Sequence, residues 1–128
     1  MSEQAFVPTM YLKQGCPFCF KLRLFLLEAG LLDQVALRQF VVGTDEERAI
    51  RAELVQQLEK VSFPAAQIMP GQFMRDGDAI IGRLAGRAGI DPANLPTLQA
   101  YIAGPLAVHI QLYQENVALK NGASDPGA

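Results

Sequence analysis

The two cysteines of this chain, Cys16 and Cys19, are separated only by proline and phenylalanine in the run GCPFCFKL. Pro17 suits the first position of a helix, which places Cys16 at the N-cap, beside unpaired amide N–H groups. A thiolate is stabilised there, and Lys13 adds positive charge nearby, so the pKa of Cys16 is expected to be low. Cys19 is expected one helical turn further on, more shielded from solvent, with its sulfur on the same side of the helix as the sulfur of Cys16. The spacing therefore predicts thiol–disulfide exchange, with Cys16 as the attacking thiol and Cys19 as the resolving thiol.

Two other interpretations of the cysteine pair stay open at this point. A zinc site normally takes four ligands, and the only histidine of the chain, His109, is far away in the sequence, so an intrachain zinc site is disfavoured. Because His109 lacks polar neighbours at the spacing of a catalytic triad, we expect a packed or surface helix residue. Free cysteine also packs as a small hydrophobic side chain, so both thiols could be structural. Their position, between a predicted strand and a predicted helix, favours the redox interpretation.

The elements that must position the cysteines alternate between strands and helices. We expect strands at 7–12, 35–42, 65–69 and 72–74, the second of them mostly buried, and helices at 17–30, 44–58 and 76–84. Thr44 and Glu47 form a capping box for the second helix, whose apolar stripe runs to Leu58, and Asp76 can cap the third. The order β-α-β-α-β-β-α gives parallel strands from the crossover and an antiparallel pair from the hairpin. We therefore expect an α/β fold with a four-stranded mixed sheet and helices on both faces.

The first predicted helix is apolar on two sides and therefore needs two partners. One partner is the sheet, and the other is expected to be the C-terminal segment, 91–120, which reads as helical. Pro105 should kink or divide that segment, because an interior proline loses a hydrogen bond. Its predicted docking face consists of Leu106, Ile110, Tyr113 and Val117. The last residues, 121–128, are expected to form a flexible tail.

Composition narrows the range of partners and compartments. Eleven basic and thirteen acidic residues give a net charge of −2, which argues against a broad nucleic-acid surface. The opening run MSEQAFVPTM lacks the pattern of a secretory signal, and no apolar run is long enough to span a bilayer. Two cysteines so close together do not form the disulfide framework of a small secreted protein. We expect a cytoplasmic protein without nucleic-acid or membrane partners.

The motif KQGCPFC, the strand order and the motif SFPAAQI together resemble the glutaredoxins and the N-terminal domain of glutathione transferases. This resemblance covers roughly residues 6–90 and implies a thioredoxin-like βαβαββα domain at 1–90, with 91–120 as a helical extension packed on it. It also implies a cis peptide bond between Phe63 and Pro64, beside the active cysteine. The backbone of Phe63 would then pair with an extended peptide such as glutathione.

The same resemblance implies glutathione contacts outside the cysteine pair. Lys13 matches a basic position that contacts a glutathione carboxylate, and Phe18 stands where glutaredoxins carry a tyrosine. Asp76 fits an acidic position at the start of the third helix, whereas Gly77 replaces the serine that usually follows it. The hydroxyl is lost, but the amide of Gly77 can still bind a carboxylate at a helix N-terminus.

Taken together, these features predict a glutathione-linked thiol–disulfide oxidoreductase, with glutathione as co-substrate and disulfides as substrates. One alternative is a small glutathione transferase, in which Cys16 positions or transiently binds glutathione. The C-terminal segment resembles only the opening helix of a transferase's second domain, so the usual pocket for an electrophilic substrate is expected to be absent. Another alternative is a non-catalytic module that binds glutathione or holds an iron–sulfur cluster between two chains. For the leading interpretation no metal is expected, and the protein is expected to be a monomer or a homodimer.

Overall fold

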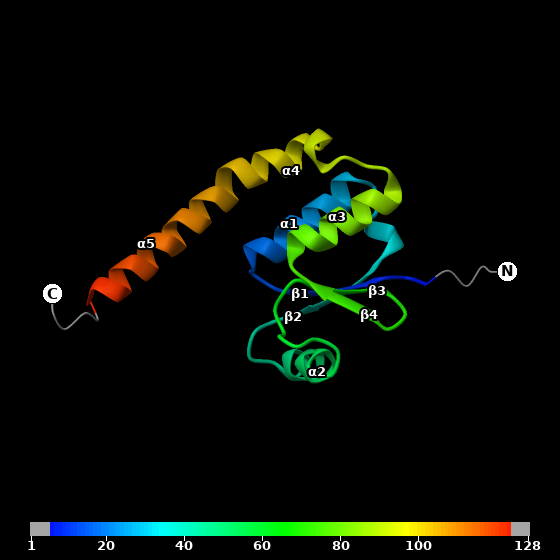
Figure 1. Ribbon diagram of the computed structural model, residues 1–128, viewed down its shortest axis with the longest axis horizontal. Helices are drawn as coiled ribbons and strands as arrows, with labels where there is room; N and C mark the ends of the chain where they lie inside the picture. The colour runs from blue at the N-terminus through cyan, green and yellow to red at the C-terminus, as the bar shows by residue number, and fades with distance from the viewer. Residues whose placement is uncertain (1–5, 124–128) are drawn as a thin grey trace.

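The computed structural model describes residues 6–123, in which a four-stranded mixed sheet carries helices on both faces (Figure 1). The strands are β1 (Thr9–Lys13), β2 (Ala36–Phe40), β3 (Ala65–Met69) and β4 (Gln72–Arg75), in the spatial order β2-β1-β3-β4. β1 runs parallel to β2 and antiparallel to β3, and β3 pairs with β4 as an antiparallel hairpin. The predicted α/β class and element order are confirmed, and the arrangement is that of a thioredoxin-like fold.

The main helices are α1 (Pro17–Glu28), α2 (Asp45–Leu54) and α3 (Gly77–Ala88). α1 and α3 cover one face of the sheet and α2 covers the other (Figure 1). β1 is central, so its side chains are buried alternately on the two faces. Met10 and Leu12 pack with α1 and α3, whereas Tyr11 packs with Ile50 and Leu54 of α2. The central strand thereby fixes the position of the loop that carries the cysteines.

The predicted caps form, with one shift in partner. The amide of Glu47 donates to Thr44 Oγ1 at 3.4 Å, and the Glu47 carboxylate accepts from the amide of Gly43 at 2.7 Å rather than from Thr44. At the start of α3 the amide of Asp78 donates to Asp76 Oδ1 at 3.1 Å. α2 ends at Leu54, so the prediction that the helix extends to residue 58 is wrong.

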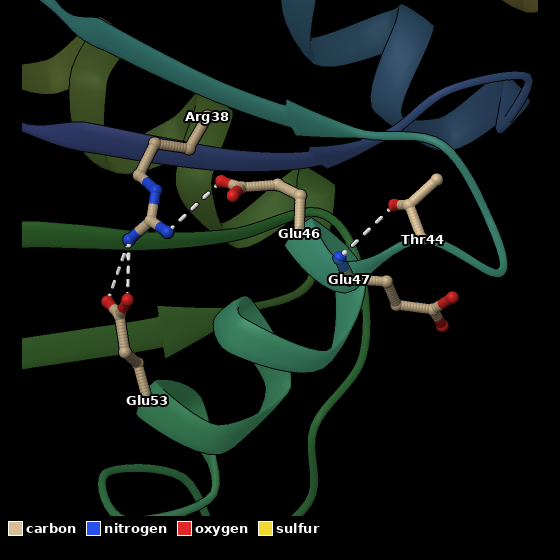
Figure 2. A network of polar contacts seen from close by, with 5 residues as sticks. All are labelled: Arg38, Thr44, Glu46, Glu47 and Glu53. Carbon is tan, nitrogen blue, oxygen red and sulfur yellow. Dashed lines mark hydrogen bonds and ion pairs between the residues drawn. The ribbon is translucent and has the colours of Figure 1, made fainter.

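The prediction of a mostly buried strand at 35–42 is also wrong. β2 is an edge strand in which only Phe40 is buried, and Val41 and Val42 beyond it are more than half exposed. Arg38 of β2 instead reaches across to α2, where its guanidinium donates to Glu53 at 2.7 Å and to Glu46 at 3.2 Å (Figure 2). A run of apolar residues favours burial, but a strand with one neighbour is covered only where a helix passes over it.

The C-terminal segment continues as one helical run with a π-helical turn inside it. Two 3₁₀ turns stand elsewhere, η1 (Leu32–Gln34) and η2 (Pro92–Asn94); the run itself is α4 (Pro96–Tyr101), the π turn η3 (Ile102–Leu106) and α5 (Ala107–Ala123). Pro105 lies in the π turn. Proline has no backbone N–H to donate, and the π turn accommodates the missing hydrogen bond. α4 docks on α1 as predicted: the amides of Thr97 and Leu98 donate to the Glu28 carboxylate at 2.9 and 2.7 Å.

Beyond its first turn the predicted docking face is wrong. Leu106 is buried, but Ile110 and Tyr113 are 37% and 64% exposed, and α5 extends away from the sheet (Figure 1). α5 also continues to Ala123, into the segment predicted as a tail; residues 124–128 lie outside the described part of the chain. None of the helices within residues 6–123 is long and apolar enough to cross a membrane.

Candidate active site

Cys16 occupies the N-cap of α1, as predicted, with extended backbone angles and Pro17 directly after it. The preceding Gly15 has a φ of 83°, a backbone conformation that residues other than glycine rarely adopt. This turn leads the chain from β1 into the helix. The turn is closed by the amide of Cys16, which donates to the carbonyl of Lys13 at 3.2 Å. Cys16 is half-buried and lies beyond the end of β1, an interior strand of the sheet.

Cys19 lies one turn further along α1 and is buried, with 3% of its surface exposed. Its sulfur accepts a hydrogen bond from the backbone amide of Lys13 at 3.3 Å. Both cysteines are free thiols. The predicted division into an accessible thiol and a shielded thiol is therefore present in the structure.

The two thiols have opposite electrostatic environments. The pKa of Cys16 is lowered from 9.0 to about 5, chiefly because the Cys19 thiol donates a hydrogen bond to it. The amides of Cys19 and Phe18 and the charge of Lys13 lower it further, and partial burial opposes them. The pKa of Cys19 is raised, first because its proton is shared with Cys16 and then because of burial. At neutral pH the pair therefore holds one thiolate, on Cys16, and one thiol, on Cys19.

Two openings flank the N-terminal half of α1. The first, which we call the cysteine hollow, has a volume of about 200 Å³. It is lined by both cysteines and by Leu12, Lys13, Gln14, Gly15, Phe20, Arg23 and Gln39. The second, which we call the Pro64 cleft, has a volume of about 470 Å³. It is lined by Phe18, Lys21, Phe63, Pro64, Asp76, Gly77 and Asp78, and on one side by Ile102, Leu106, Ala107 and Ile110.

The predicted site residues divide between these openings. Cys16, Cys19 and Lys13 line the cysteine hollow, whereas the other five predicted residues line the Pro64 cleft: Phe18, Phe63, Pro64, Asp76 and Gly77. The predicted site residues thus form two groups rather than one. Lys13 does not lie with the other residues that were predicted to contact glutathione.

The floor of the Pro64 cleft is a close approach between α3 and the loop before β3. The Phe63–Pro64 peptide bond is cis, as predicted. A Cβ atom added to the buried Gly77 would lie 3.4 Å from Pro64 Cγ and 3.7 Å from the carbonyl oxygen of Phe18. Gly77 therefore fits where α3 begins against Pro64, and a larger side chain there would press on the proline ring.

Two residues of the site were missed by sequence reasoning. Lys21 is 7% exposed and forms an ion pair with Asp78 at the Pro64 cleft. The hydroxyl of Tyr101 donates to the carbonyl of Pro17 at 2.8 Å. The pKa of Tyr101 is raised by burial and then by the negative charge of Cys16, so the phenol lies within electrostatic reach of the thiolate. A cation on a largely apolar helix was a possible signal for Lys21, but nothing local indicated Tyr101.

His109 was predicted to be a packed or surface helix residue; it is exposed on α5, and its ring meets that of Phe18 edge to face with 6.1 Å between the ring centroids. Within residues 6–123, no three His, Cys, Asp or Glu side chains gather as a candidate metal-binding group.

A scan against models of known protein families and a search of curated protein sequences found no match to this chain. The functional assignment therefore depends on the fold and on the geometry of the cysteine pair.

Proposed function

We propose that this protein is a glutathione-linked thiol–disulfide oxidoreductase. The observation that carries the proposal is the asymmetry of the pair: Cys16 is accessible with a pKa of about 5, and Cys19 is buried with a raised pKa. Cys16 is a nucleophile at neutral pH, and Cys19 stays protonated until it attacks the mixed disulfide on Cys16. Two structural cysteines in a core would not require such a difference in pKa.

The reaction follows from these two states. The Cys16 thiolate attacks one sulfur of a substrate disulfide, whose S–S bond breaks and releases one half as a thiolate. Cys19 then gives its proton to that departing thiolate or to water and attacks Cys16 Sγ. The second half leaves as a thiolate, which takes a proton from water, and a Cys16–Cys19 disulfide remains. The substrate has gained two electrons, and two glutathione molecules restore the dithiol as they become glutathione disulfide.

The Pro64 cleft supports glutathione as the reductant. Five residues that the resemblance to glutaredoxins and glutathione transferases assigns to glutathione line this one cleft, although they come from three separate segments of the chain. The N-terminal amides of α3 suit a carboxylate, and the backbone of Phe63 suits an extended peptide. Lys13 faces the other opening, so a role for Lys13 with glutathione requires the tripeptide to reach past the cysteines.

One observation favours the transferase alternative. The pocket for an electrophilic substrate was expected to be absent, yet Ile102, Leu106, Ala107 and Ile110 form an apolar wall on the Pro64 cleft. An apolar group next to bound glutathione could rest there. Conjugation of glutathione to an electrophile would not need Cys19, so a Cys19→Ser variant with full conjugating activity and no loss in disulfide reduction would favour the transferase.

The test is a glutathione-coupled assay on two substrates, a small glutathione mixed disulfide and a peptide with an internal disulfide. We expect Cys16→Ser to abolish both reactions, by about 10³-fold or more, since it removes the nucleophile. Cys19→Ser should lose the reduction of the peptide disulfide and keep part of the reaction with the mixed disulfide, which free glutathione can resolve. Wild-type activity in Cys16→Ser would contradict the proposal.

A further inference from the structure

The cysteine hollow and the Pro64 cleft differ in charge as well as in lining. The hollow contains two cations, Lys13 and Arg23. Arg23 donates through Nη1 to the neutral side chain of Gln39 at 3.0 Å. Within residues 6–123 neither cation forms an ion pair with a carboxylate. The one anion that lines the hollow is the Cys16 thiolate, so the two cations leave it with a net positive charge.

The carboxylate that Lys13 influences, that of Glu47, is already engaged by other donors. Lys13 contributes to the lowered pKa of Glu47, so the Glu47 carboxylate lies within electrostatic reach of it. That carboxylate, however, accepts hydrogen bonds from the amide of Gly43 at 2.7 Å and from Arg51 at 2.8 Å. Its charge is shared with these donors, and it leaves the two cations of the hollow available to a ligand.

The Pro64 cleft has the opposite balance. Its one cation, Lys21, is buried and paired with Asp78, and Asp76 stands unpaired by any cation at the start of α3 among the residues that line it. The Pro64 cleft thus offers the side chains of an acidic peptide no free cation, whereas the cysteine hollow offers Lys13 and Arg23. The charge of a peptide therefore steers it toward one opening before any contact is made.

From this we propose that the cysteine hollow is the docking site for polypeptide disulfides that carry Asp or Glu beside the cysteine, with Lys13 and Arg23 as the residues that select them. The inference rests on the proposed thiol–disulfide exchange and adds its substrate class. A substrate carboxylate that meets Arg23 holds the disulfide over Cys16 Sγ, because residues 16, 19, 20 and 23 follow one another along a single face of α1. Gln14 and Gln39 offer amide groups to the peptide backbone at the same opening.

The chemistry within the hollow is the exchange described above, with the substrate as oxidant. The Cys16 thiolate forms a bond to one substrate sulfur, the substrate S–S bond breaks, and the released sulfur takes a proton from Cys19 or water. The Cys19 sulfur, hydrogen-bonded to Cys16 in the same hollow, then attacks Cys16 Sγ; the mixed disulfide bond breaks and the second substrate sulfur leaves as a thiolate that water protonates. Besides water, no group outside the protein and the disulfide is needed for this half of the cycle.

The experiment uses three short peptides, each with one internal disulfide, identical except for flanking Glu, Gln or Lys residues. The fully reduced full-length protein is mixed with each peptide without glutathione, and the second-order rate constant of reduction is measured. We expect the Glu peptide to react about tenfold faster than the Gln peptide at low salt, the Lys peptide to react slowest, and the differences to shrink in high salt.

Arg23→Gln is the informative variant, because Arg23 is not among the groups that shift the pKa of Cys16, whereas Lys13 is. It should reduce the Glu-to-Gln rate ratio by about threefold or more. Arg87→Gln is the control, because it removes the same charge near the other end of β1. Arg87 lines an opening with Val7 and Pro8, which precede β1, whereas Lys13 is the last residue of that strand. In this variant the Glu-to-Gln rate ratio should stay at the wild-type value.

Two kinds of failure can be told apart. If the Gln peptide is reduced in a Cys16-dependent manner but the Glu peptide shows no advantage, or Arg23→Gln keeps the wild-type ratio, the docking inference is overturned and the proposed function stands. If no peptide is reduced, or Cys16→Ser reduces them equally well, both are overturned.

Discussion

The cysteine hollow and the Pro64 cleft share one helix and are assembled in different ways. The hollow takes almost all its lining from one short stretch, 12–23, with Gln39 from the neighbouring strand. The cleft is closed by residues from α1, the loop before β3, the start of α3 and the C-terminal segment. Local sequence is therefore enough to build the reactive thiol, whereas a binding surface beside it requires the whole tertiary structure.

The largest effect should come from the C-terminal wall of the Pro64 cleft. Leu106 is buried, so Leu106→Ala leaves a cavity and should lower the free energy of unfolding by about 2–5 kcal/mol. Leu112→Ala on the exposed side of α5 should change it by less than about 0.5 kcal/mol. Urea denaturation of both variants measures the difference. Equal stabilities would show that the wall is not part of the core.

A smaller effect is expected at the floor of the cleft. Gly77→Val places a branched side chain against Pro64 and should raise the KM for glutathione by about tenfold, while the rate at which Cys16 is alkylated stays the same. Gly82→Val is the matched control, because it makes the same change in α3, where a Cβ would meet nothing within 4 Å. If alkylation of Cys16 slows as much as glutathione turnover, the two openings are not independent.

Sequence reasoning succeeded where the determinants are close together in the chain. The N-cap position of Cys16, the buried Cys19 and the cap at Asp76 all depend on residues within one turn of one another, and all three were predicted. The distinctive backbone geometry at Pro64 also came from a local motif, SFPA, through resemblance.

It failed where a partner is distant or where a pattern has no unique partner. The contacts of Lys21 with Asp78 and of Tyr101 with Pro17 join residues far apart in the sequence, so no local pattern indicates them. The apolar spacing on α5 was real, but periodicity specifies a stripe and not what covers it. Sequence also attributed the low pKa of Cys16 to the helix N-terminus, whereas the hydrogen bond from Cys19 contributes most.

That hydrogen bond offers the most direct test of the central claim, that Cys16 is a thiolate because Cys19 is a thiol. The measurement is the alkylation rate of Cys16 against pH, with the modified residue identified by mass spectrometry. Because Cys16 is deprotonated above its pKa, the wild-type rate should rise through about pH 5 and stay level at neutral pH. Cys19→Ala removes the donor and should move the midpoint upward, and Cys19→Ser, which keeps a hydroxyl donor, should move it less. A wild-type rate that keeps rising toward the ordinary thiol pKa of 9.0, or a midpoint that Cys19→Ala leaves in place, would contradict the account.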